Sequence, residues 1–87
     1  MVTLTMCIDI RLSAIFARVL SYETALLLTM NSSTETVPGW DSTTYLAIIL
    51  EIESEFGLEL STLDAARMNS VASICEVLRE KGVALAL

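Results

Sequence analysis

The residue best placed for chemistry in this sequence is Ser42, which follows the pair Pro38-Gly39 and the acidic residue Asp41. Pro and Gly predict a turn, and Asp41 is then the expected N-cap of a helix that begins with Ser42. The free N–H groups and the positive dipole end of such a helix stabilise an anion, so a phosphodiester on the Ser42 hydroxyl would lie in a favourable field. The ordinary alternative is that Ser42 serves only to cap the helix.

Ser42 is not predicted to act as a self-activated nucleophile. The chain has no His, and no Lys lies near Ser42 in sequence, so no neighbour could deprotonate the hydroxyl. The lack of His also rules out a His-based catalytic triad. Cys7 and Cys75 lie far apart, without acidic residues at ligand spacing, so we expect no metal site and two reduced thiols. We therefore expect that the chain is not an enzyme.

The elements that would position Ser42 are predicted to be helices. Apolar residues with helical spacing, together with capping signals, predict helices over 7–20, 42–56, 62–67 and 70–81. Gly57 is the expected left-handed end of the second helix, and Ser61 with Asp64 resembles a capping box. The prediction is an all-α single domain over 1–87, a small antiparallel four-helix bundle with three main helices and a short third one. Its first loop is long, and Leu26-Leu27-Leu28 is expected to anchor it in the core.

Composition limits the partners of this domain. Of the 87 residues, 54% are hydrophobic, and the net charge is -6. This acidity has the wrong sign for contacts with phosphate backbones, so we expect no nucleic-acid partner and favour a protein with a basic docking patch. No apolar run approaches the roughly 20 residues that span a bilayer, and the N-terminus lacks the basic region of a secretory signal. We therefore expect a cytoplasmic protein without membrane insertion.

Four segments together resemble the acyl carrier protein family. They are Gly39-Trp40-Asp41-Ser42, Glu53 to Leu60, Asp64-Ala65-Ala66 and Ser70-Val71, in the order and spacing of that family. The resemblance covers 37–80 well and the first helix more loosely. It implies that a phosphopantetheinyl transferase moves the 4′-phosphopantetheine of coenzyme A onto Ser42, with Asp41 in support. Its thiol would then carry acyl groups as thioesters between acyl-activating or acyl-transfer enzymes and synthases, in fatty-acid or specialised lipid or polyketide biosynthesis. Because such a carrier must visit several enzymes, we expect a monomer.

The sequence departs from the family pattern just after Ser42. Thr43 stands where the family usually has Leu, and Thr44 and Ala47 stand where carriers of fatty-acid synthesis often have acidic residues. These departures change the expected docking surface more than the expected modification. The Pro-Gly-Trp-Asp-Ser form is more similar to carriers of specialised pathways.

The candidate docking residues lie on the second and third predicted helices. They are Thr43, Leu46, Leu50, Arg67 and Met68. Leu46 and Leu50 follow Ser42 by one and two helical turns and would contact partner enzymes, although both could instead complete the core. Trp40 is expected to pack against the bundle rather than to contact a ligand.

Two alternative functions stay open at this point. Within the same chemistry, the chain could carry aminoacyl or peptidyl groups, as a thiolation carrier does, or D-alanyl groups. From another class, it could be an unmodified helical interaction module that binds a partner through its acidic face. Modification of Ser42 distinguishes both carriers from the interaction module.

Overall fold

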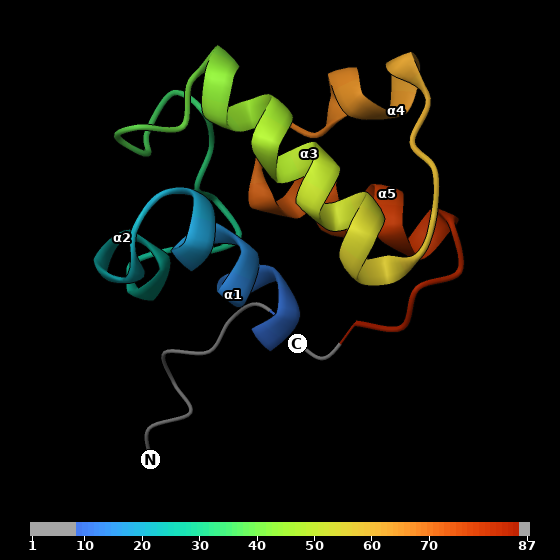
Figure 1. Ribbon diagram of the computed structural model, residues 1–87, viewed down its shortest axis with the longest axis horizontal. Helices are drawn as coiled ribbons and strands as arrows, with labels where there is room; N and C mark the ends of the chain where they lie inside the picture. The colour runs from blue at the N-terminus through green and yellow to red at the C-terminus, as the bar shows by residue number, and fades with distance from the viewer. Residues whose placement is uncertain (1–8, 86–87) are drawn as a thin grey trace.

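The computed structural model describes residues 9–85, and this part of the chain is helical (Figure 1). The helices are α1 (Ile10–Val19), α2 (Tyr22–Leu26), α3 (Ser42–Phe56), α4 (Thr62–Arg67) and α5 (Val71–Glu80). The described residues form no strand, only an isolated antiparallel bridge between Ser33 and Ser70. The predicted all-α class is therefore confirmed for the described residues. The helices predicted over 42–56 and 62–67 have these bounds, and the last helix is one residue shorter at each end than predicted.

The first helix and the loop that follows it differ from the prediction. Within the described residues α1 begins at Ile10, with the buried Asp9 as its N-cap, whereas the predicted start at residue 7 lies outside the described residues. The segment predicted as a long loop contains α2, which Ser21 caps by accepting a hydrogen bond from the Thr24 amide. A helix of five residues is too short to show an apolar period, so the prediction could not detect it.

The leucine run anchors the loop through one residue only. Leu28 is buried with 4% of its surface exposed, whereas Leu26 and Leu27 are 53% and 79% exposed. The expectation that the whole run enters the core is therefore wrong for two of its three members. α2 makes its own contact with the core through the buried Ala25.

One hydrophobic core joins α1, α3 and α5. The fully buried side chains of these helices include Leu12, Ile15, Phe16, Ile52, Ile74 and Leu78. Trp40, just before α3, enters the same core and meets the Phe16 ring edge-on, with the ring centroids 5.0 Å apart. This contact holds the segment that leads into α3 against α1. Cys75 is buried and unpaired, in agreement with a reduced thiol, and Cys7 lies outside the described residues.

Backbone hydrogen bonds fasten the first loop to the start of α5. The Val71 and Ala72 amides donate to the carbonyl oxygens of Ser32 and Met30, at 2.9 and 3.2 Å. These bonds satisfy two N–H groups that the first turn of a helix leaves free. The loop is thereby brought beside the junction of α4 and α5, although it is distant from that junction in sequence.

The short helix α4 has no fully buried residue of its own. It is held against α5 by ion pairs between Arg67 and Glu80, at 2.8 Å, and between Asp64 and Lys81, at 2.7 Å. Because exposed ion pairs contribute little, the stronger anchor is its C-cap residue Met68, which is fully buried. Within 9–85, no helix has both the length and the hydropathy that crossing a bilayer requires.

Candidate functional site

A complete capping box fixes the start of α3. The Asp41 carboxylate accepts hydrogen bonds from the Thr43 and Thr44 amides at 3.1 and 3.2 Å. In return, the Thr44 hydroxyl accepts from the Asp41 amide at 2.9 Å, and it donates to the Gly39 carbonyl. Gly39 has a φ of 88°, a conformation that side chains with a Cβ rarely adopt. The predicted N-cap role of Asp41 is confirmed, with threonine completing the box.

Ser42 takes no part in this cap. It is the first residue of α3 and is exposed, and neither its amide nor its hydroxyl bonds to another described residue. The alternative that Ser42 is present as a cap therefore fails, because Asp41 already fills that role. What remains is an exposed hydroxyl, next to a free N–H group, at the positive end of a helix of 15 residues.

A cavity of about 430 Å³ lies beside Ser42. It is lined by residues from the first loop, the start of α3, α4 and the α4–α5 junction: Thr34, Trp40, Asp41, Ser42, Tyr45, Ala66 and Asn69. Burial raises the pKa of the Tyr45 phenol, which therefore stays protonated at neutral pH. Asp41 is the single charged residue in this lining, and its Oδ1 accepts hydrogen bonds from two backbone amides. The other polar groups of the lining are neutral and can form hydrogen bonds.

The Trp40 ring is packed in the core, but its indole N–H donates no hydrogen bond to the described part of the chain. The residue has 2% of its surface exposed, and its Nε1 has no hydrogen-bond partner among the described residues. The expectation that Trp40 packs against the core is confirmed by its contact with Phe16. No sequence signal reveals that the N–H of this residue lacks an acceptor.

An exposed face of α3 runs away from Ser42. Leu46 and Leu50, at 61% and 65% exposure, follow Ser42 by four and eight residues and so lie on its side of the helix. The alternative that both leucines complete the core is therefore wrong. Thr43 is exposed next to this face.

The two candidate docking residues near α4 are placed differently. Met68 is fully buried, so its assignment to a docking surface is wrong, because the α4–α5 junction turns its side chain into the core. Arg67 is exposed, but it binds Glu80 with two nitrogens and also pairs with Glu76, which raises its pKa. Leu63, with 79% exposure, is an apolar surface residue of α4 that the sequence analysis missed.

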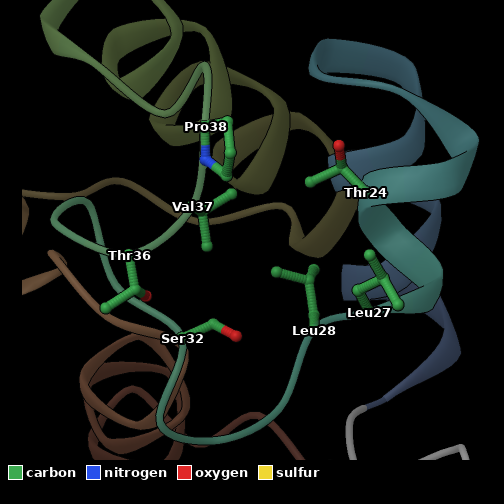
Figure 2. A pocket seen from close by; sticks show the side chains of 7 residues that line it. All are labelled: Thr24, Leu27, Leu28, Ser32, Thr36, Val37 and Pro38. Atoms are coloured by element: carbon green, nitrogen blue, oxygen red, sulfur yellow. The ribbon is translucent and has the colours of Figure 1, made fainter.

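A second cavity, of about 350 Å³, lies between α2 and the first loop. Its lining, drawn in Figure 2, consists of Thr24, Leu27, Leu28, Ser32, Thr36, Val37 and Pro38. Figure 2 shows Leu28 and Val37 on opposite sides of this space. The lining has no charged residue, and the Ser32 and Thr36 hydroxyls accept hydrogen bonds from nearby loop amides. The second cavity is thus more apolar than the cavity beside Ser42.

Comparison with known proteins adds no assignment to this geometry. No protein-family model matches the chain, and no curated protein matches it significantly in sequence.

Proposed function

We propose that the protein is an acyl carrier and that the Ser42 hydroxyl is the attachment point of a 4′-phosphopantetheine arm. The observation that carries this proposal is that Ser42 is exposed and unbonded, while its neighbour Asp41 caps the helix. Capping, the usual purpose of such a serine, is therefore fulfilled by another residue. The order of the four segments that resemble the carrier family supports the same assignment. In this proposal α1, α3, α4 and α5 are the antiparallel four-helix bundle of a carrier, and α2 is an addition within its first loop.

The proposed attachment is a phosphoryl transfer that needs a second protein. The Ser42 Oγ–P bond forms while the pyrophosphate bond of coenzyme A breaks, and adenosine 3′,5′-bisphosphate leaves. The hydroxyl proton passes to a base of the transferase, because the chain has no His and no Lys near Ser42 in sequence. The resulting phosphodiester anion lies at the positive end of α3, beside the free Ser42 amide, where the helix stabilises it.

The cavity beside Ser42 suits the chemistry of such an arm. Beyond its phosphodiester the arm is uncharged and carries a hydroxyl and two amides. The side chains of Thr34, Tyr45 and Asn69 that line the cavity are likewise uncharged and can donate or accept hydrogen bonds. When bound, the arm would supply a terminal thiol that holds acyl groups as thioesters. The same site would serve an aminoacyl, peptidyl or D-alanyl cargo, since these differ only beyond the thiol.

We propose that the transferase and the acyl-handling enzymes dock on the exposed face of α3. Thr43, Leu46 and Leu50 would make the apolar contacts, and Arg67 would contribute at the edge of α4. Several acidic residues of the chain are exposed on α3 and after it, among them Glu55 and Glu59. A partner with basic residues around an apolar centre matches this surface.

The proposal is tested by the intact mass of the purified chain after incubation with coenzyme A, Mg²⁺ and a phosphopantetheinyl transferase of broad specificity. The wild type is expected to gain one phosphopantetheinyl unit, and Ser42→Ala is expected to gain none. Ser54→Ala is the matched control, because Ser54 is another exposed serine of α3, and it should be modified like the wild type. No gain with several transferases on a folded chain would refute the carrier function and favour the unmodified interaction module.

A further inference from the structure

The indole of Trp40 has a role that packing alone does not explain. Its ring is fixed edge-on against Phe16, yet its Nε1–H is buried without an acceptor among the described residues. Buried donors are nearly always paired in native proteins, because an unpaired donor has lost water and gained nothing in return. A phenylalanine would make the same ring contact without this penalty. The indole N–H therefore points to an acceptor that arrives from outside the chain.

The position of Trp40 indicates where that acceptor would come from. Trp40 and Ser42 line the same cavity, and their Cα atoms are at most ~7 Å apart, because only Asp41 lies between them in the chain. The first amide carbonyl of a phosphopantetheine arm is six covalent bonds from the Ser42 Oγ. In a fully extended chain, six covalent bonds span roughly 7 Å. An uncharged carbonyl oxygen, the acceptor that an indole N–H prefers, is thus within reach of Trp40.

We propose that Trp40 Nε1 donates a hydrogen bond to the amide carbonyl nearest the phosphate of the arm, and so holds the arm at its root in the cavity beside Ser42. This inference rests on the proposed attachment to Ser42. Since Nε1 is covered in the unmodified chain, the contact requires a side-chain shift in the cavity wall, and it forms only after modification. Trp40 is thus a binding residue for the arm as well as a core residue.

The chain contains one Trp, so a single indole N–H signal in a ¹H–¹⁵N spectrum reports this contact without ambiguity. The experiment compares the full chain before and after modification, with intact mass confirming that the arm is attached. The expected result is a downfield shift of the indole proton. Ser42→Ala treated in the same way should keep the signal of the unmodified chain.

A second measurement follows the arm itself. With a ¹⁵N-labelled arm, the amide nearest the phosphate should be ordered on the wild type and should become flexible on Trp40→Phe, with an order parameter below about 0.6. Trp40→Phe keeps an aromatic ring beside Phe16 and removes the donor. Ser54→Ala is the control, because Ser54 is exposed on α3 and is not among the residues that line the cavity, and the arm should stay ordered on it.

The outcomes separate this inference from the proposed function. If the chain gains no mass, the attachment of the arm to Ser42 is refuted. A modified chain whose indole signal does not move, and whose arm is equally mobile on the wild type and on Trp40→Phe, overturns the role of Trp40. Shifts of the Leu28 and Val37 methyl signals in place of the indole would locate the arm in the cavity of Figure 2, and would also overturn it. If Trp40→Phe does not fold, the wild-type indole comparison still decides the question.

Discussion

Replacing Asp41 by alanine tests whether Ser42 is free of a structural task. The substitution removes the acceptor of two hydrogen bonds, those from the Thr43 and Thr44 amides, and leaves two N–H groups to water at the start of α3. Loss of an N-cap acceptor costs about 1 kcal/mol, within a range of roughly 0.5–2 kcal/mol. In a domain of this size such a loss lowers Tm by about 4–8 °C. Thermal unfolding followed by far-UV circular dichroism measures the shift.

Two further variants make this test specific. Asp41→Asn keeps a good capping oxygen and removes the charge, so its Tm should fall by much less than that of Asp41→Ala. Ser42→Ala removes a hydroxyl that bonds to no described residue and should change the free energy of unfolding by less than about 0.5 kcal/mol. If Ser42→Ala destabilised the protein as much as Asp41→Ala does, Ser42 would be a structural residue. Its hydroxyl would then have a structural role and would not be the attachment point of the arm.

Three other predictions concern the framework of the site. Lys81, 2.7 Å from Asp64, lowers the pKa of that carboxyl to about 2, so the stabilisation is present above its ordinary value of 3.8 and is lost as the pH falls through about 2. The urea concentration at the unfolding midpoint should therefore fall as the pH is lowered from 4 to 2. It should fall less steeply in Lys81→Gln, and an equal fall in that variant would show that Lys81 is not the cause. Leu50→Ala should change the free energy of unfolding by less than about 0.5 kcal/mol, whereas Ile52→Ala should cost about 2–5 kcal/mol in urea denaturation, because only Ile52 is buried. Burial also raises the pKa of the Cys75 thiol, so peptide mass spectrometry should find its alkylation only after unfolding, and rapid labelling of the native chain would show that this part of the core opens.

The features of this protein that the sequence predicted correctly are local ones. Asp41 as an N-cap, Gly57 as a left-handed helix end with a φ of 65°, and the capping box of Ser61 with Asp64 all depend on residues a few positions apart. The bounds of α3 and α4 follow from these signals, which need no knowledge of the rest of the fold. The prediction that the Ser42 hydroxyl could be modified had the same local basis.

Other features were decided by contacts between residues that are distant in the chain. The family resemblance assigned Met68 to a docking surface, yet Met68 is buried because the α4–α5 junction folds over the core. Leu46 and Leu50 are as apolar as their neighbours, and only the packing of α3 leaves them exposed. Whether a side chain is buried depends on all of its neighbours in the fold. When a helix is apolar on more than one side, the periodicity of its sequence does not show which side is buried.

The candidate site shows the same division most clearly. The sequence by itself determined that a hydroxyl would stand at the start of a helix behind an acidic cap, because capping is a hydrogen bond between near neighbours. Only the tertiary structure decided that this hydroxyl is unbonded and that a cavity beside it is completed by Thr34 and Asn69 from other parts of the chain. The same long-range packing buried the indole of Trp40 and left its N–H without a partner among the described residues. Cavities and unpaired donors arise where separate segments meet, so no single segment encodes them.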